Sequence, residues 1–308
     1  MKGAHMKGAW RTRVVGSGSV VPGRRDRAMS GRAGPVIGAR KAGRAPVARI
    51  GAPRVWSPSL VMRPPPLPHQ TNLLRGVLRR ITGAVEEGAR TPLVVFDLDA
   101  TLYDNRPRTL EILMEYREQI LDGRPEVAEA LATLTSERVE YLLSDTLRGC
   151  GVTRADVVAD VTRFWHERFF TDAYCQHDAP VEGAPEYVRA CHEAGAIIVY
   201  LTGRDLPGML LGTVSSLRDC GFPIGIAGTE LILKPDANLP DEAFKRGALP
   251  TLERVGELAA FFDNEPANTN LAKQMFPDAT TVLLETQRVP YAPPLAEGVE
   301  VVADFRVG

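Results

Sequence analysis

The chain of 308 residues is long enough for one large domain or two small ones, and its 44% hydrophobic and 24% charged residues are ordinary for a soluble globular protein. No apolar run approaches the length needed to cross a membrane, which argues against a membrane protein. The formal net charge of −1 hides an asymmetry: residues 1–68 hold 14 Lys and Arg against one acid, leaving 37 − 14 = 23 basic and 38 − 1 = 37 acidic residues in the remainder. An acidic body argues against nucleic acid spread over its surface.

The four cysteines show no Cys-x-x-Cys spacing, and a chain of this length needs no disulfide framework. We therefore expect buried or free thiols and a reducing, cytoplasmic location. The oligomeric state has no sequence indicator.

Residues 1–68 are rich in Gly, Ala, Arg and Pro and lack hydrophobic periodicity, which is typical of a disordered tail. A nucleic-acid or membrane-surface arm is a second interpretation, but Trp10 stands nearly alone where base stacking needs interleaved aromatic residues. A third is that translation starts at Met29 or Met62, so that residues 1–61 are not expressed.

Hydrophobic periodicity predicts a helix over residues 71–89, followed by a short buried strand at Leu93–Phe96. Residues 106–181 then change character and predict a helical insertion. Its helices are expected near residues 110–120, 127–134, 138–147 and 155–170.

Beyond the insertion the chain alternates between the two kinds of element. Helices are expected at 185–193, 206–220 and 243–255, and strands at 196–201, 231–233, 258–262, 280–284 and 299–302. This alternation predicts an α/β fold with a doubly wound parallel sheet. The ligands of such a sheet bind beyond the carboxyl ends of its strands.

Two carboxylates follow the first strand, Asp97 and Asp99, and residues at i and i+2 point the same way. Like charges so close raise a pKa unless a cation lies between them. Mg²⁺ suits a site built from few carboxylates, waters and a phosphate.

Three later stretches carry further candidates for phosphate chemistry. Thr202 and Gly203 follow the second long strand, where a hydroxyl and free N–H groups suit a phosphate oxygen. Two lysines compete to neutralise a phosphoryl group, Lys234 just past a strand and Lys245 before the next helix. Another buried strand delivers Asp263 at its end.

The stretch Asp97-Leu98-Asp99-Ala100-Thr101-Leu102-Tyr103-Asp104 resembles the first motif, Asp-x-Asp-x-Thr, of the haloacid dehalogenase (HAD) superfamily. The usual glycine is replaced by Ala100, a departure we expect to be mild because alanine needs only an ordinary backbone conformation there. The resemblance covers Leu93 to the C-terminal end, and Thr202 matches the family's second motif. The family's lysine lies near a helix start, which favours Lys245.

Asp263 matches the acid of the fourth motif, while Asn264 and Asn268 occupy places where a second acid often stands. Their amide oxygens would hold a metal more weakly than a carboxylate, although Glu265 would compensate. The resemblance thus implies a metal site of Asp97, Asp99 through its carbonyl, Asp263, Asn264 and Asn268.

The resemblance implies a HAD-like core of residues 69–105 and 182–308, covered by a C1-type helical cap at 106–181. The implied activity is Mg²⁺-dependent hydrolysis of a small phosphate monoester through an aspartyl-phosphate. Asp97 is then the nucleophile, and Asp99, protonated at first, is the acid and later the base.

Thr202 and a lysine would hold the phosphoryl oxygens, with Thr101, Gly203 and Arg204 as further substrate contacts. For Arg204 a surface ion pair is an equal alternative. Because the family's dehalogenases lack an acid at the place of Asp99, carbon–halogen chemistry is disfavoured. A phosphomutase, a phosphonate-cleaving enzyme and a catalytically silent binding protein remain alternatives.

An aromatic cluster within the insertion reads as packing of its core rather than as a site. Its members lie at helical spacing: Phe164, Trp165, His166, Phe169, Phe170, Tyr174 and His177. Together with the nearby cysteine they offer too few ligands for zinc.

Overall fold

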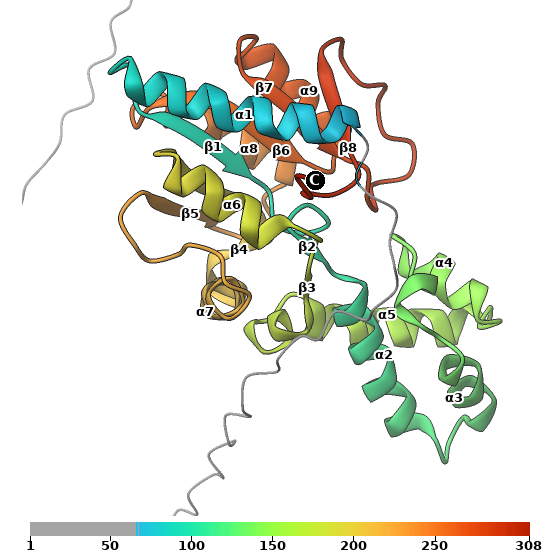
Figure 1. Ribbon diagram of the computed structural model, residues 1–308. Helices are drawn as coiled ribbons and strands as arrows, with labels where there is room; N and C mark the ends of the chain where they lie inside the picture. Colours follow the sequence, from blue (N-terminus) through green and yellow to red (C-terminus); the bar gives the residue numbers. More distant parts are fainter. Residues whose placement is uncertain (1–65, 67) are drawn as a thin grey trace, which may run out of the picture. The chain divides into compact units, whose positions relative to one another are not determined.

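The computed structural model describes Pro66 and residues 68–308, which lie in one compact unit (Figure 1). The predictions made for the basic segment, its disorder and the alternative start sites, fall outside these described residues. Within them, no helix combines the length and apolar character that crossing a bilayer requires.

Six parallel strands form the central sheet, in the order β5-β4-β1-β6-β7-β8. Their bounds are β1 Pro92–Phe96, β4 Ile197–Asp205, β5 Thr229–Lys234, β6 Glu257–Asp263, β7 Thr280–Leu284 and β8 Val299–Val302. The chain builds outward from β1 through β4 to β5, then returns to the other side of β1 with β6. The predicted doubly wound parallel sheet is confirmed. The strand order reverses at β1, and ligands of such sheets bind beyond the carboxyl ends of the strands at this point.

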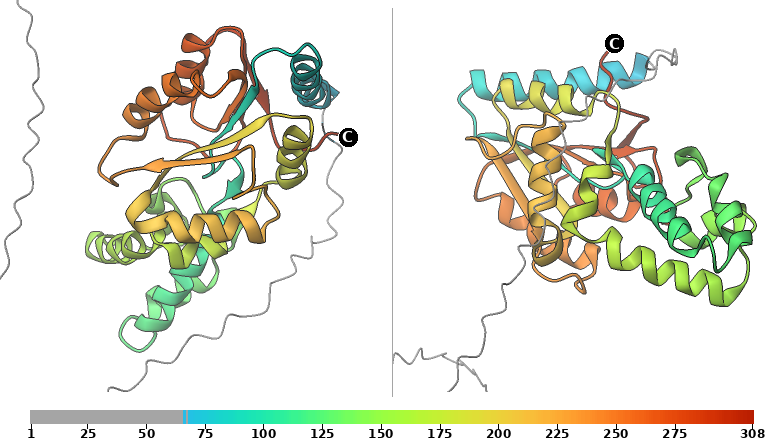
Figure 2. Two further views of the ribbon diagram at one scale, coloured as in Figure 1. Left: turned by 90° about the vertical axis from the view of Figure 1, so that its left-hand side faces the viewer. Right: turned by 90° about the horizontal axis from the view of Figure 1, so that it is seen from below.

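Helices cover both faces of the sheet, as Figure 2 shows from two further directions. Alternation along β1 sends Val94 and Phe96 to one apolar cluster and Leu93 and Val95 to another. The first cluster packs under α1 Pro68–Glu86 and α6 Ala184–Glu193, with part of α7 Leu206–Asp219; the second packs under α8 Asp241–Leu252 and α9 Pro266–Met275. Because both faces of β1 are covered, all five of its residues are buried, which explains its continuous apolar run.

The helical insertion leaves and rejoins the core through a short antiparallel pair, β2 Tyr103–Asp104 and β3 Ala179–Pro180. Its other elements are α2 Arg106–Ile120, α3 Pro125–Ala132, η1 Ser136–Arg138, α4 Leu143–Gly149, α5 Ala155–Phe169 and η2 Asp172–His177. An apolar core of its own holds these helices together. In Figure 1 they group beside the sheet, beyond the end of β1.

The predicted helix at residues 138–147 is confirmed only in its second half. A 3₁₀ turn ends at Arg138, residues 139–142 are not helical, and α4 begins only at Leu143. Val139 turns extended and buries its side chain, while the Thr146 hydroxyl accepts a hydrogen bond from the Glu140 N–H at 2.8 Å. Burial of one side chain therefore interrupts a helix that periodicity alone predicts.

The aromatic cluster of the insertion is only partly core. Phe164 packs against Tyr116, with ring centroids 5.1 Å apart, inside the insertion's apolar core. Trp165 stacks on Phe169 at 4.4 Å, whereas Phe170 is 42% exposed. The packing interpretation therefore holds for Phe164 and not for Phe170.

The insertion meets the core most closely at Gly212 of α7. A Cβ atom there would overlap the backbone of Asp172 in η2, whose carboxylate accepts a hydrogen bond from the Gly212 N–H at 2.6 Å. We expect Gly212→Ala to lower the free energy of unfolding by about 1–3 kcal/mol, measured by urea denaturation. Gly247→Ala in α8, where a Cβ meets nothing within 4 Å, is the control and should raise it by about 0.5–1 kcal/mol. Equal effects of the two substitutions would contradict this close packing.

Candidate active site

Asp97 lies directly beyond the carboxyl end of β1. Its N–H donates to the Phe262 carbonyl of β6 at 2.9 Å, and the residue is 6% exposed. Lys245 of α8 reaches it from the side: its Nζ lies 2.7 Å from Asp97 Oδ1 and 2.7 Å from Asp263 Oδ2. The ends of two neighbouring strands and one helix thus bring two carboxylates and an ammonium together.

These three groups carry a net charge of −1 when both carboxylates are ionised. Burial raises the pKa of Asp97 to about 7, a rise that the Lys245 charge limits and the Asp263 charge supports. Burial alone would lower the pKa of Lys245, but the two carboxylates raise it above its ordinary value. The site therefore lacks one positive charge, and a further cation would stabilise it.

Lys234, the competing lysine, lies elsewhere. Its Nζ donates to Asp241 Oδ1 at 2.7 Å and to the carbonyls of Ala237 and Leu239 at 3.3 and 3.1 Å. These contacts close the loop that leads into α8. The structure thus brings Lys245, and not Lys234, to the two carboxylates.

The two predicted amide ligands are engaged with protein groups. Asn264 Oδ1 accepts from the Thr101 hydroxyl at 3.2 Å, and its Nδ2 donates to the Gln287 carbonyl at 2.7 Å. Asn268 turns its Nδ2 toward both oxygens of Asp263, at 3.2 and 3.1 Å. Asn268 therefore orients the carboxylate of Asp263 with its amide nitrogen.

Glu265, which we expected to compensate for the missing acid, accepts from the Val289 N–H at 3.0 and 3.3 Å. Its own N–H donates to Asp263 Oδ1 at 2.8 Å. Burial raises the pKa of the Glu265 carboxyl, with the Asp263 charge adding to the rise.

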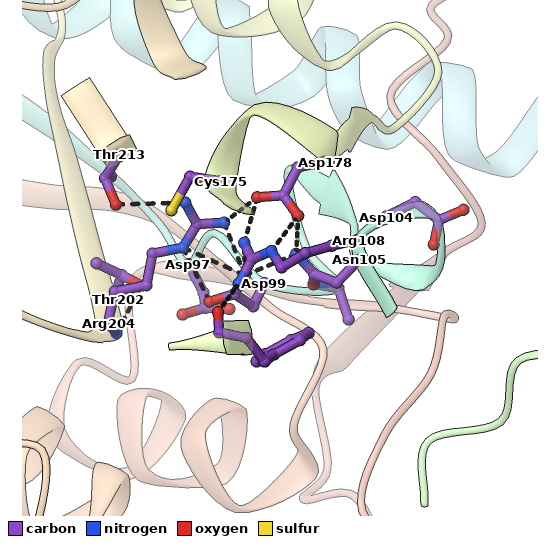
Figure 3. Close-up of polar contacts among 12 residues, drawn as sticks. Asp97, Asp99, Asp104, Asn105, Arg108, Cys175, Asp178, Thr202, Arg204 and Thr213 are labelled. Atoms are coloured by element: carbon purple, nitrogen blue, oxygen red, sulfur yellow. Dashed lines mark hydrogen bonds and ion pairs between the residues drawn. The ribbon is translucent and has the colours of Figure 1, made fainter. Parts of the chain in front are cut away.

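Asp99 faces a different group of side chains (Figure 3). Arg204 donates to its carboxylate from Nε at 3.2 and 3.0 Å and from Nη2 at 2.7 Å, while Arg108 Nη2 lies 3.3 Å and Asn105 Nδ2 2.7 Å away. Burial would raise the pKa of Asp99, but the charges of Arg204 and Arg108 outweigh it and hold that pKa at about 2. In this arrangement the two arginines favour the ionised form of Asp99, whereas the expectation from sequence is that it starts protonated.

The second predicted motif lies within β4, whose pairing with β5 shifts register between Thr202 and Asp205. Thr202 is fully buried and its hydroxyl accepts from the Arg204 N–H at 3.2 Å. A Cβ at Gly203 would overlap the Asp241 carboxylate, so any larger residue here would displace that side chain. Arg204 is 2% exposed, and the surface ion pair considered for it is wrong.

Ala100 departs from the expected backbone. Its φ is +57°, in the left-handed region that favours glycine, so the expectation of an ordinary conformation is wrong. The turn holds it there, because its N–H donates to Asn105 Oδ1 at 2.8 Å and its carbonyl accepts from the Thr286 hydroxyl. The usual glycine of the motif would fit this conformation without a steric penalty.

Ala100→Gly is therefore expected to raise the free energy of unfolding by up to about 1 kcal/mol, because relief of the left-handed strain exceeds the added chain entropy. Urea denaturation measures it. The control, Ala130→Gly inside α3, should lower the same quantity by about 1 kcal/mol. A loss at both positions would show that Ala100 bears no strain.

Three residues of the site escaped the sequence analysis: Asn105, Arg108 and Asp178. Arg108 and Asp178 lie in or beside the insertion, 70 positions apart, and both side chains are fully buried. Arg108 is a polar residue on the buried side of α2, the one local indication of a special role. The pairing itself is a long-range contact that no local pattern predicts.

The oxygen ligands that the site offers decide whether it can hold a divalent metal. In the described part of the chain, no three His, Cys, Asp or Glu side chains group to hold a metal, because Asp99 turns its carboxylate toward the arginines. Asp97 and Asp263 remain, two carboxylates that share one ammonium and lack a positive charge. Mg²⁺ is commonly held by one or two carboxylates, waters and a substrate phosphate, so these residues fit it.

No protein-family model and no curated protein matches this sequence. Solved structures similar to the chain include a phosphatase candidate from Clostridium difficile (TM-score 0.47, 15% identity, 70% of this chain and 94% of that one). A haloacid dehalogenase-like family hydrolase from Streptococcus pneumoniae (0.37, 12%, 63% and 84%) and CbbY from Rhodobacter sphaeroides in complex with phosphate (0.39, 17%, 70% and 95%) are similar too. With TM-scores below 0.5, these similarities do not decide which reaction this chain performs.

Proposed function

We propose that this protein is a HAD-type phosphohydrolase, dependent on Mg²⁺, that hydrolyses a small phosphate monoester through an aspartyl-phosphate on Asp97. One observation carries the proposal: a buried aspartate at the carboxyl end of the central strand, bonded at 2.7 Å to a lysine that also binds a second aspartate. The motif resemblance of residues 97–104 supports it.

In the first half of the reaction, a carboxylate oxygen of Asp97 attacks phosphorus. The bond from phosphorus to the ester oxygen breaks, and its electron pair goes to that oxygen, which takes a proton from solvent water. Lys245 and the Thr202 region stabilise the charge on the phosphoryl oxygens. Burial of Asp97 aids this step because a poorly solvated carboxylate attacks without first losing a water shell.

In the second half, a water oxygen attacks the phosphorus of the aspartyl-phosphate, and the bond to Asp97 breaks with its electron pair returning to the carboxylate. Asp99 is a carboxylate in the structure, so the proposal assigns it the part of the base that accepts the water's proton. Arg204 and Arg108 fix the direction of that carboxylate.

A bound Mg²⁺ would be held by Asp97, Asp263 and the main-chain carbonyl of Asp99, next to Asn264. When bound, it supplies the positive charge that the two carboxylates and Lys245 lack, and it screens the approach of the anionic ester. The carboxylate of Asp263 is held ready by Asn268 and by the Glu265 N–H.

The test is phosphate release by the full-length chain from a broad panel of phosphate monoesters. We expect release from at least one ester with Mg²⁺, loss after treatment with a chelator, and recovery when Mg²⁺ is added back. The positive charge missing beside Asp97 is the reason for this dependence. Release that is unaffected by chelation would contradict the metal, and no release from any ester would contradict the proposed function.

A further inference from the structure

Asp178 is a buried carboxylate that the reaction steps above do not use. It lies between η2 and β3, where the insertion rejoins the core, and its side chain has no exposed surface. It accepts hydrogen bonds from Asn105 Nδ2 at 2.8 Å, Arg108 Nε at 2.8 Å and Arg204 Nη2 at 2.7 Å.

The three donors on Asp178 are the same three that hold Asp99. Each of them therefore bridges the two carboxylates, as the dashed lines in Figure 3 show. The donors come from two parts of the chain: Asn105 and Arg108 lie at the start of α2, and Arg204 is near the end of β4. Asp178 thus connects all three donors to one another, as Asp99 does.

Charge balance makes Asp178 necessary to this arrangement. The two guanidinium groups and two carboxylates sum to zero, and a buried guanidinium without a partner is strongly unfavourable. Aromatic and backbone contacts fix the arginines further: Arg108 Nη1 donates to the Phe169 carbonyl at 3.1 Å, and the Arg204 Cζ lies 5.3 Å from the Tyr103 ring centroid. Without Asp178, two cations would compete for Asp99 alone.

We propose that Asp178 is a positioning residue for the reaction, acting through Asn105, Arg108 and Arg204 to fix the carboxylate of Asp99. This inference rests on the proposed function. The insertion would then contribute to the reaction, because Asp178 at its C-terminal end sets the orientation of Asp99, two positions from the nucleophile Asp97. Asp178 itself is not a catalytic residue.

A double-mutant cycle with Asp178→Asn and Asp99→Asn tests the inference on the full chain, with kcat and KM measured for an ester that the parent hydrolyses. We expect Asp178→Asn to lower kcat by about 10–100-fold while KM changes much less. In the Asp99→Asn background the same substitution should have almost no further effect. Equal losses in both backgrounds would overturn the inference and leave a structural role.

The matched control is Asp304→Asn, which removes a buried acid that accepts from Arg306 Nε at 2.8 Å and from Gln70 Nε2 at 2.6 Å. It should lower stability without lowering kcat. If Asp178→Asn does not fold, the charge-balanced pair Arg108→Gln with Asp178→Asn takes its place in the cycle, with the same expectation. If the parent chain releases no phosphate, the proposed function and this inference are both contradicted. If the parent releases phosphate but the two substitutions lower kcat independently, only the inference is contradicted.

Discussion

Lys245→Met is expected to lower phosphate release by about 10²–10³-fold, because it removes an ammonium that binds both Asp97 and Asp263. The substitution also leaves two carboxylates close together in a buried site, so we expect a lower melting temperature in the absence of metal. Steady-state kinetics with saturating Mg²⁺ and a thermal scan without metal measure the two effects.

The matched control is Lys234→Met. Lys234 pairs with Asp241, whose side chain is 58% exposed, and it closes a loop rather than touching the two site carboxylates. We expect its release rate to stay within about threefold of the parent, since none of the contacts of Lys234 reaches Asp97 or Asp263. A larger loss of activity for Lys234→Met than for Lys245→Met would contradict this account, because it would identify Lys234 as the phosphate-binding lysine.

Asp97→Asn is expected to abolish phosphate release and, at the same time, to stabilise the metal-free protein. Activity disappears because an amide does not attack phosphorus to form the acyl phosphate. Stability rises because the substitution lets Lys245 pair with Asp263 alone, which makes the buried group neutral. Function and stability are thus opposed at this residue.

The pH dependence of that stabilisation follows from the pKa of Asp97, which burial raises from 3.8 to about 7 in the folded chain. The unfolded chain loses this proton first, so ionisation weakens folding as pH rises from about 4 to about 7, and the full cost remains above that range. Asp97→Asn should therefore stabilise by up to about 4 kcal/mol at pH above about 7, and by little near pH about 4. Urea denaturation at both pH values measures it.

Asp219→Asn serves as the control for this effect, because its side chain is 61% exposed and its substitution should change stability little at either pH. An Asp97→Asn protein that is less stable than the parent at high pH would show that the Lys245 contact outweighs the cost of burial. Phosphate release by Asp97→Asn at the rate of the parent would exclude Asp97 as the nucleophile.

The parts of the fold that depend on local pattern were predictable. The apolar runs that end at Asp97 and Asp263 are strands β1 and β6, and the two aspartates lie where the carboxyl ends of these strands meet. Their burial on both faces leaves a continuous apolar run, which a sequence shows directly. Helix α9, by contrast, was not predicted, although Pro266 at its first turn is a typical start.

The parts of the site that depend on long-range contacts were not predictable. Nothing near Asp99 in the sequence indicates that Arg204 and Asp178 surround it, because those contacts span 105 positions and a whole insertion. The same is true of the protonation of Asp99, which those arginines decide. The conformation of Ala100 was missed for a related reason. Its left-handed φ is held by hydrogen bonds to the side chains of Asn105 and Thr286, which lie outside the Asp-x-Asp-x-Thr motif.

The central claim is that phosphorus becomes covalently bound to Asp97. Its most direct test is to mix the full-length chain with Mg²⁺ and an ester that it hydrolyses, and to quench the reaction in acid within one turnover. Mass spectrometry of the peptides then locates any added phosphoryl group. The account predicts one phosphoryl group on Asp97, formed and lost at the rate of phosphate release, and none in Asp97→Asn. A phosphoryl group on another residue, or release with no adduct at any time during the turnover, would contradict it.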